Sequence, residues 1–321
     1  MLNLKSFAKL GLVATLSLAA GSVFANSYPE HPIKIYVPYQ AGGSTDIVIR
    51  KLAELAAPKL GQPVVIENKP GAGATLGAIE IKNAKPDGYT LAITPSPVFR
   101  MPHMQSTAYD PLTDFTYISM LSGYILGVAV NADSPYKTWE DLVQAARENP
   151  GKIDYGTASV GSASNVMMEQ IAAALDIEWV HIPYKGESEL LSNILGGMLD
   201  VYAGSSTVAP FVKDGTMRML VTWGEEPSPL YPGTPTLNSI DPQFEPVYSP
   251  FGIAGPADMD PAVVEKLENT FKEILETEAF QEMLLQYGQQ PVFMTSEEYG
   301  KYAKEKYDEE KIIVEQLNLA G

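Results

Sequence analysis

The chain of 321 residues contains no cysteine. Disulfide bonds, thiolate metal sites and a lipid anchor on cysteine are therefore excluded, and the fold must rely on a large apolar core. Histidine is nearly as scarce: His31, His103 and His181 form no recognisable catalytic or metal-binding spacing. No aspartate-rich calcium loop is present either. We therefore expect neither a metal nor a cofactor.

Positive charge is also scarce, because 22 lysine and arginine residues face 39 acidic residues and give a formal net charge of -17. A chain with this charge repels nucleic acid and anionic membrane surfaces at long range, so neither is expected as a partner. A small anionic ligand is not excluded. Hydrogen-bond donors that contact such a ligand directly can outweigh the repulsion from distant acidic residues, because salt screens that repulsion.

Long apolar runs are limited to the N-terminus. Lys5 and Lys9 precede an apolar run over residues 10–20, which is well short of the roughly 20 residues that cross a bilayer. Small residues follow up to Ala25, so we predict a secretory signal peptide over residues 1–25 that is cleaved after Ala25. No later segment favours stable membrane insertion, and we expect a periplasmic protein. The remaining chain, about 296 residues, predicts two domains.

Short apolar runs alternate with helical patterns along the rest of the chain, which is typical of an α/β fold. Because the runs are apolar throughout, we predict parallel sheets that are covered on both faces. Residues 94–114 are rich in proline and polar residues and are predicted to form a loop. The expected strands cover residues 33–37, 64–66, 89–94, 125–130, 153–156, 179–183, 201–204 and 217–223, and the expected helices cover residues 44–60, 72–83, 139–148, 162–175, 189–198, 263–275 and a segment from 296.

Two glycine loops each follow a predicted strand and precede a predicted helix. Glycine lets the backbone approach a ligand closely, and the hydroxyl and carboxylate side chains that follow are typical helix N-caps. Unpaired N–H groups at a helix N-terminus favour an anion, so two such loops facing across a cleft suit a carboxylate. Two unrelated capped turns give the same pattern, and this alternative stays open. The first loop comprises Tyr39, Gln40, Ala41, Gly42, Gly43, Ser44, Thr45 and Asp46, and the second includes Thr157, Ser159, Gly161, Ser162 and Ser164.

Three further patterns give little support to an enzyme or a nucleotide site. A hydrolase nucleophile turn around Ser159 needs glycine where Thr157 stands. His181 alternates with apolar residues in a predicted strand, so we interpret it as a hydrogen-bonded structural residue. The glycines over residues 71–77 lack the dinucleotide-binding spacing, and we expect a tight turn there.

Short motifs occur along nearly the whole mature chain. They are Tyr28-Pro29, Val37-Pro38-Tyr39 running into Ala41 to Asp46, and residues 66–73, 86–90, 149–152, 181–186 and 195–197. Together they resemble the periplasmic substrate-binding proteins of tripartite tricarboxylate transporters, also called Bordetella uptake gene or TctC-like proteins. Each motif is short, but their number and order argue against chance similarity.

The resemblance implies a periplasmic-binding-protein-like clamshell of two α/β domains with a ligand cleft between them. Domain 1 would combine residues 26–126 and 249–321, and domain 2 would comprise residues 127–248, with hinges near residues 126–127 and 249–252. The two glycine loops would bind a ligand carboxylate, partly through ordered water. From domain 2, the cleft would also receive Tyr184, Lys185, Ser205 and Ser206.

Three departures from the family pattern leave the ligand open among mono-, di- and tricarboxylates and aromatic acids. Tyr39 and Gln40 replace the usual phenylalanine and proline, an arginine usual before Pro235-Thr236 is absent, and acidic residues follow Gly186. Among these, we favour a helix-dipole role for Glu187 and Glu189. The alternative is that they lower the positive potential of the pocket and disfavour tricarboxylates.

We expect a monomeric, non-enzymatic extracytoplasmic solute receptor. It would bind a small organic carboxylate, a di- or tricarboxylate or an aromatic acid, and deliver it to the large and small membrane subunits of a tripartite tricarboxylate transporter. Two alternatives stay open. One is a secreted hydrolase of carboxylate esters that acts through Ser159 or Ser162. The other is a ligand-sensing partner of a membrane kinase.

Overall fold

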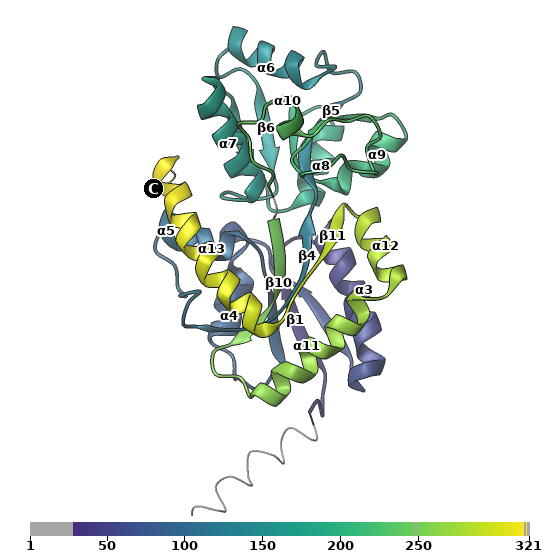
Figure 1. Cartoon of the computed structure of the whole chain (residues 1–321), viewed down its shortest axis with the longest axis vertical. Helices are drawn as coiled ribbons and strands as arrows, with labels where there is room; N and C mark the ends of the chain where they lie inside the picture. Colours follow the sequence, from purple (N-terminus) through teal and green to yellow (C-terminus); the bar gives the residue numbers. More distant parts are fainter. Residues whose placement is uncertain (1–27, 248, 318, 320–321) are drawn as a thin grey trace, which may run out of the picture.

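The computed structural model describes residues 28–247, 249–317 and 319, so the predicted signal peptide lies outside the described residues. Figure 1 shows two α/β domains, one above the other, connected by extended segments. The predicted α/β class with two domains is confirmed. None of the helices in the described ranges combines the length and the apolar character needed to cross a membrane.

The lower domain in Figure 1 is built on a six-stranded sheet. Along each strand, successive side chains point to opposite faces, so Ile35 and Tyr36 belong to different core clusters. Each face is therefore covered by its own helices. In spatial order the strands are β11 (Gln289–Met294), β4 (Phe115–Tyr124), β10 (Ser249–Pro256), β3 (Thr90–Thr94), β1 (Ile33–Val37) and β2 (Val64–Asn68).

Two groups of helices cover these faces. On one face, α3 (Ser44–Leu60), α11 (Pro261–Leu275) and α12 (Glu278–Gln286) pack against the side of the sheet that carries Ile35. The other face is covered by α4 (Leu76–Lys82), which follows the short η1 (Ala72–Ala74), and by α5 (Pro97–Met104) and α13 (Ser296–Gln316).

The upper domain follows the same plan on a five-stranded sheet. Val128 and Ala129 are neighbours in one strand but belong to the two different core clusters of this domain. The strands are, in spatial order, β7 (Val180–Pro183), β6 (Asp154–Thr157), β8 (Val201–Ser205), β5 (Leu126–Asn131) and β9 (Met217–Thr222). Helices α6 (Trp139–Glu148), α7 (Ala163–Leu175) and α10 (Leu237–Ile240) cover one face, and α8 (Glu187–Leu195), η2 (Ser206–Val208) and α9 (Ala209–Lys213) cover the other.

The prediction of wholly parallel sheets is wrong, because each sheet contains a strand that arrives from the other domain and β11 also pairs antiparallel with β4. β10 enters the lower sheet and pairs antiparallel with both β3 and β4. β5 enters the upper sheet and pairs antiparallel with both β8 and β9. Each strand that crosses between the domains is antiparallel to its neighbours in the sheet that it enters. Apolar runs in the sequence do not reveal this direction.

The prediction of a loop over residues 94–114 is also wrong, because α5 lies within it. Pro97 suits the first turn of a helix, where its missing N–H has no intrahelical partner. Pro102 lies inside α5 and cannot donate to the carbonyl of Val98, but the Tyr109 hydroxyl donates to that carbonyl at 3.0 Å instead. A tertiary hydrogen bond thus replaces the bond that proline removes.

Other elements also differ from expectation, and β4 and β10 are absent from the predicted strands. β11 was not predicted, because Pro291 interrupts its pattern, but β11 lies at the sheet edge, where proline is tolerated. α8 begins at Glu187 rather than at residue 189. This earlier start brings the Glu187 side chain to the wall of the interdomain pocket described below.

The strand memberships agree with the proposed domain boundaries, which remain a proposal. β1 to β4, β10 and β11 share the lower sheet, whereas β5 to β9 share the upper one. The chain crosses upward between Tyr124 and Leu126 and returns to the lower sheet at Ser249. At the first crossing, the Ile125 N–H donates to the carbonyl of Gly288 at 2.7 Å, which ties the end of α12 to the same point.

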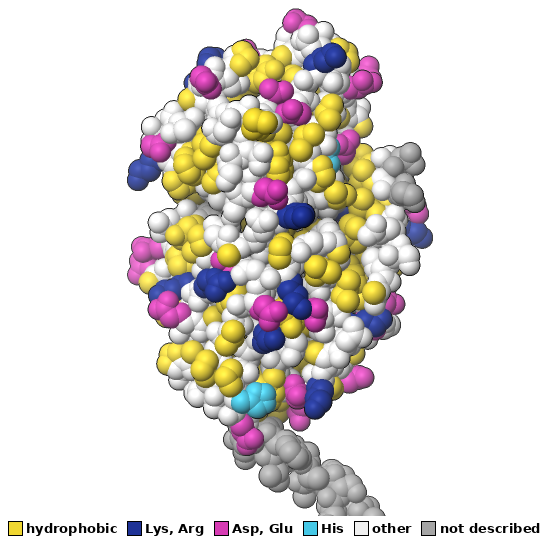
Figure 2. Space-filling view, turned by 180° about the vertical axis from the view of Figure 1, so that it is seen from behind, with side chains coloured by type: hydrophobic (Ala, Val, Ile, Leu, Met, Phe, Trp, Pro, Cys, Tyr) yellow, Lys and Arg dark blue, Asp and Glu magenta, His cyan; other side chains and the backbone are white. Residues whose placement is uncertain are grey.

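Charged side chains are mixed on the surface. Figure 2 shows this from behind, with acidic and basic side chains interspersed over both domains. Many form exposed ion pairs, such as Lys59 with Glu273 at 2.7 Å and Lys301 with Glu297 at 2.6 Å. Exposed pairs of this kind contribute little to stability.

Candidate functional site

The two domains enclose a narrow pocket with a cavity volume of about 50 Å³. Four helices, α3, α5, α7 and α8, begin at its wall. The segments that cross between the domains complete it. The lining residues are Tyr39, Gly43, Ser44, Thr45, Pro95, Pro97, Tyr124, Leu126, Ala158, Ser162, Ala163, Ser164, Glu187, Ser205 and Ser249.

The first glycine loop is held in shape by the buried carboxylate of Asp46. Its oxygens accept hydrogen bonds from the Gly42 N–H at 2.9 Å, from Asn68 Nδ2 at 2.8 Å and from Arg50 Nε at 3.0 Å. The Asn68 amide also donates to the carbonyl of Tyr39 at 3.0 Å. Asp46 therefore acts on the backbone of the loop rather than on the pocket.

The pKa of Asp46 reflects these contacts. Burial opposes ionisation, but hydrogen bonds from Arg50, Gly42 and Asn68 outweigh it and hold the pKa of Asp46 below its usual value. The carboxylate stays ionised at neutral pH. The stability that it contributes is present above the unfolded-state pKa and is lost as the pH falls through the lower folded-state pKa.

The loop leaves donors pointing toward the pocket. Gly43 is the N-cap of α3 and provides no side-chain cap, so the first-turn N–H groups of Ser44 and Thr45 are not used by a capping side chain. The Ser44 hydroxyl accepts a hydrogen bond from Gln289 Nε2 at 2.7 Å, and its own hydrogen is left for a ligand. Gly42 has φ +88°, whereas Gly43 has φ -78°. The left-handed conformation therefore belongs to Gly42.

The second glycine loop is capped from within. Ser162 is the N-cap of α7, and its hydroxyl accepts from the Asn165 N–H at 3.2 Å. The Asn165 side chain accepts from the Gly161 N–H at 3.0 Å. Gly161 has φ +65°, which favours glycine at this turn. Together these bonds fix the start of α7 where Ala163 and Ser164 line the pocket.

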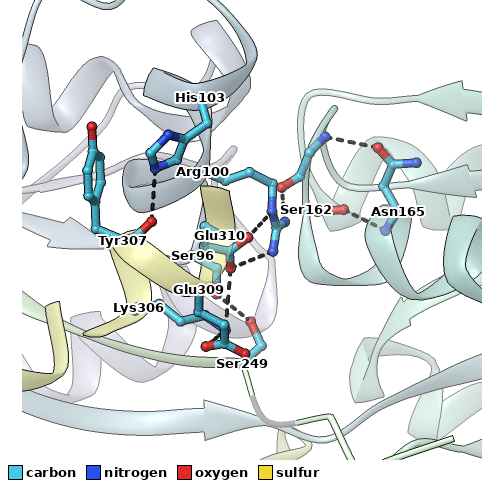
Figure 3. Close-up of polar contacts among 11 residues, drawn as sticks. Ser96, Arg100, His103, Ser162, Asn165, Ser249, Lys306, Tyr307, Glu309 and Glu310 are labelled. Carbon is cyan, nitrogen blue, oxygen red and sulfur yellow. Dashed lines mark hydrogen bonds and ion pairs between the residues drawn. The ribbon is translucent and has the colours of Figure 1, made fainter. Parts of the chain in front are cut away.

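Arg100, on α5, connects this second loop to the lower domain, as Figure 3 shows. Its guanidinium donates to the carbonyl of Gly161 across the domain interface and to both carboxylate oxygens of Glu310 on α13, with Nη2 to Oε1 at 2.7 Å. Both side chains are almost fully buried. Lys306 also pairs with Glu310, at 3.4 Å. A buried charge pair in the lower domain thus positions a loop of the upper domain.

A second contact across the interface involves the first loop. The Ser188 hydroxyl, in the first turn of α8, donates to the carbonyl of Ala41 at 3.1 Å. A Cβ placed on Gly43 would lie 3.7 Å from Glu187 Cβ, so this glycine is close to the opposite domain. The domains are therefore in contact on both sides of the pocket.

The two acidic residues that follow Gly186 have different environments. Glu189 accepts from the Lys185 N–H at 3.0 Å at the start of α8, which fits the helix-terminus interpretation. Glu187 instead lines the pocket and accepts from the Ser205 N–H at 3.1 Å. Burial raises the pKa of Glu187 above its usual value. None of the described residues lining the pocket is a lysine or an arginine.

The structure brings part of the predicted site together. The predicted residues that line the pocket are Tyr39, Gly43, Ser44, Thr45, Ser162, Ser164 and Ser205. The predicted residues that belong to the same loops but not to the pocket wall are Gln40, Ala41, Gly42, Asp46, Thr157, Ser159 and Gly161. Also outside the wall are Tyr184, Lys185 and Ser206. Lys185 is exposed, and the Ser206 hydroxyl donates to the carbonyl of Ile125 at 3.3 Å.

Several pocket residues were not predicted. Pro95 and Pro97 follow the carboxyl end of β3, and the rule that ligands bind at the carboxyl ends of strands could have indicated them. Tyr124, Leu126 and Ser249 lie at the two crossings, next to the predicted hinges. Arg100 and Gln289 act from behind the pocket, and no local sequence pattern indicates either residue.

The histidine and serine residues do not form a triad in the described part of the chain. His181 Nε2 lies 2.7 Å from the Thr157 hydroxyl, and burial lowers the pKa of His181 to about 4, so the ring is neutral at neutral pH. This fits the predicted structural role. Ser159 Oγ is buried without a hydrogen-bond partner, and no histidine bonds to Ser162 among the described residues. The same residues contain no cluster of three or more potential metal ligands.

Asp46→Ala should destabilise the protein more than Arg50→Ala. The first change leaves the Gly42 N–H and the Asn68 amide without their charged acceptor, and we expect a loss of about 1.5–3 kcal/mol in unfolding free energy. Arg50 is half-exposed, so its removal should cost under about 1 kcal/mol. Urea denaturation of both variants at pH 7 measures the difference. Equal losses would show that Asp46 does not hold the loop.

Arg100→Lys should favour domain opening. Lysine retains a positive charge near Glu310 but cannot donate to both Glu310 and Gly161 with the geometry of a guanidinium. Loss of one charged hydrogen bond, about 1.5–3 kcal/mol, should lower the ratio of closed to open protein by roughly 10- to 150-fold. We expect a larger radius of gyration in small-angle X-ray scattering. Lys306→Gln, which removes an ion pair with Glu310 but no contact across the interface, is the control. Identical radii for the two variants would contradict the role of Arg100.

Comparison with known proteins places the chain in a family. The model of the tripartite tricarboxylate transporter family receptor matches residues 48–319. The UPF0065 protein in gbd 5'region of Cupriavidus necator is 41% identical over 309 residues, 96% of this chain and 94% of that protein. Protein BugT of Bordetella pertussis is 30% identical over 292 residues, 89% of each chain. The solved structure of periplasmic binding protein BugD is 28% identical, with a TM-score of 0.86 over 91% of this chain and 99% of that one. The chain therefore belongs to the family of tripartite tricarboxylate transporter receptors.

Proposed function

We propose that this protein is a periplasmic receptor that binds a small organic carboxylate between its two domains and delivers it to a tripartite transporter in the membrane. The observation that carries the proposal is the uncapped N-terminus of α3, which faces the N-terminus of α7 across the pocket. Family membership supports the receptor role. The same membership supports the cleaved signal peptide, the domain boundaries and the transporter subunits as partners.

The wall of the pocket suits an anion. Helix N-termini present free N–H groups and the positive end of the helix dipole, and α3 and α7 both do so here. Hydroxyls of Ser44, Ser162 and Ser164 add donors beside them. Apolar surface from Pro95, Pro97 and Leu126 would contact the carbon skeleton of the ligand. This combination suits a carboxylate attached to a short apolar chain.

Binding, rather than turnover, is the function that we favour. Hydrolysis through Ser162 needs a base within hydrogen-bond reach, and the hydroxyl is instead engaged by the Asn165 N–H. His181 contacts Thr157. Contacts such as Ser188 to Ala41 and Arg100 to Gly161 join the domains, so ligand capture by domain closure fits this geometry.

A thermal-shift screen of the mature protein tests the proposal. The panel should contain mono-, di- and tricarboxylates and aromatic acids, each at several concentrations. A ligand at about 100 times its dissociation constant adds roughly 2.7 kcal/mol of stability, which gives a clear rise in melting temperature. A flat response to the whole panel would contradict carboxylate binding, and release of an alcohol from carboxylate esters would favour the hydrolase.

Gly43→Val should abolish binding of the acid that the screen identifies, without unfolding the protein. The φ of Gly43 is -78°, which valine can adopt, so the substitution does not strain the backbone. The new side chain would project between Gln40 and Glu187 and obstruct the pocket. Ser44→Ala should weaken binding by about 1.5–3 kcal/mol, because one donor to a charged ligand is lost.

The matched control is Gly300→Val on α13, since a Cβ at Gly300 meets no atom within 4 Å. Titration calorimetry gives the affinities, and circular dichroism verifies folding. We expect the control to bind like the wild type. Unchanged binding by folded Gly43→Val would show that this loop is not the site.

A further inference from the structure

Glu187 presents a problem of charge, because it is an acidic residue on the wall of a pocket proposed for an anion. Its carboxyl group lies opposite the first glycine loop, with Glu187 Cβ 3.7 Å from the position that a Cβ on Gly43 would take. No lysine or arginine among the described lining residues balances it. An ionised Glu187 would therefore repel a bound carboxylate directly.

The hydrogen bonds around Tyr202, on β8, resolve the problem. The Tyr202 hydroxyl contacts two oxygens at once: Oε2 of Glu187 and the carbonyl of Ser205, the latter at 2.8 Å. A carbonyl can only accept, and a phenol has one hydrogen to donate. If that hydrogen goes to Ser205, the contact with Glu187 needs a second hydrogen, and the only other group that can carry it is the Glu187 carboxyl.

A protonated Glu187 satisfies every contact. Its Oε2–H donates to Tyr202, Tyr202 donates to the carbonyl of Ser205, and Oε1 accepts from the Ser205 N–H at 3.1 Å. An ionised Glu187 leaves one short contact without a hydrogen. Unpaired buried polar groups are unfavourable, so the number of hydrogens available for these contacts favours the protonated, neutral form of Glu187.

The groups that face Glu187 from neighbouring elements do not supply a cation. They are phenols: Tyr39 after β1, Tyr124 at the end of β4, Tyr202 on β8 and Tyr231 after β9. Burial raises the pKa of each of these phenols, so all four stay neutral. The N-terminus of α8 favours ionisation of Glu187, but burial of the carboxyl outweighs it and raises the pKa.

We propose that Glu187 is a specificity-determining residue whose carboxyl group stays protonated and donates a hydrogen bond to Tyr202. In this neutral form it admits carboxylates that lack a positively charged group. This inference rests on the proposed function. Because the protonated Glu187 carries no charge that repels the ligand, a carboxylate binds most tightly while Glu187 is protonated. A ligand with an ammonium group instead favours an ionised Glu187 and is disfavoured here. Amino acids are therefore poorer ligands than the corresponding dicarboxylates.

Glu187→Gln provides a direct test, because glutamine reproduces the protonated acid. Its amide can donate to Tyr202 and accept from the Ser205 N–H without titrating. Glu189→Gln is the matched control, since Glu189 is two residues away, accepts from the Lys185 N–H and is not part of the pocket wall. The probes are succinate and 4-aminobutyrate, which have chains of four carbons and differ in carrying a carboxylate or an ammonium at one end.

Two measurements are needed, and the first requires no ligand. Infrared difference spectra between wild type and Glu187→Gln at pH 7 should contain the C=O stretch of a protonated carboxylic acid. Titration calorimetry over a pH series from 6 upward should give a succinate dissociation constant that is level while Glu187 is protonated and rises by up to tenfold per pH unit above the pKa of Glu187, in the wild type and in Glu189→Gln. In Glu187→Gln the constant should not change with pH, and 4-aminobutyrate should bind at least tenfold more weakly than succinate to the wild type.

The outcomes separate the two proposals. Absence of the infrared band, together with loss of 4-aminobutyrate binding in Glu187→Gln, would overturn the inference and assign an ionised Glu187 as an ammonium partner. If the wild type binds 4-aminobutyrate more tightly than succinate, the role in specificity is also overturned. A protonated-acid band in a protein that binds no carboxylate at all would overturn the proposed function itself, and the specificity role with it.

Discussion

Anion binding in this pocket depends on backbone N–H groups that are oriented before a ligand arrives. No lysine or arginine is found among the described lining residues, so helix N-termini and hydroxyls must provide the attraction. Such donors are effective only if they need not reorganise on binding. Asp46 meets this condition for the first loop, because its carboxylate fixes the Gly42 N–H and, through Asn68, the carbonyl of Tyr39.

The second loop is positioned from a distance. Arg100 bonds to the carbonyl of Gly161, and Glu310 near the end of α13 neutralises its charge. Desolvation offsets much of the attraction within a buried pair of this kind, so its main effect here is on geometry. As Figure 3 shows, the pair joins α5, α13 and the start of α7, so residues far apart in the sequence determine where one loop faces the other. Domain closure and the arrangement of the pocket thus depend on the same contact.

The local features of the fold could be predicted from sequence. The helix over Ser44–Leu60 and the cap at Ser162 follow from apolar periodicity and capping residues, and both glycine loops lie where their patterns indicated. Strand direction could not be predicted in the same way, because β5 and β10 are antiparallel to neighbours that come from elsewhere in the chain. α5 was missed because the group that accommodates Pro102 is the hydroxyl of Tyr109.

In the site, too, local features could be predicted from the sequence and long-range contacts could not. Ser44, Thr45, Ser162 and Ser164 were predicted and line the pocket, since loop chemistry is local. Gln289, which donates to Ser44, lies far along the chain. Glu187 was noticed as a departure from the family pattern, but its contact with Tyr202 depends on how α8 packs on β8. Long-range contacts of this kind require the folded structure.

A crystal structure of the mature protein with a bound carboxylate tests the central claim most directly. The account predicts one carboxylate group between the first turns of α3 and α7, within hydrogen-bond distance of the N–H groups of Ser44 or Thr45 and of Ala163 or Ser164. A ligand bound instead in the groove between α7 and α13, with both helix N-termini contacting only solvent, would contradict it.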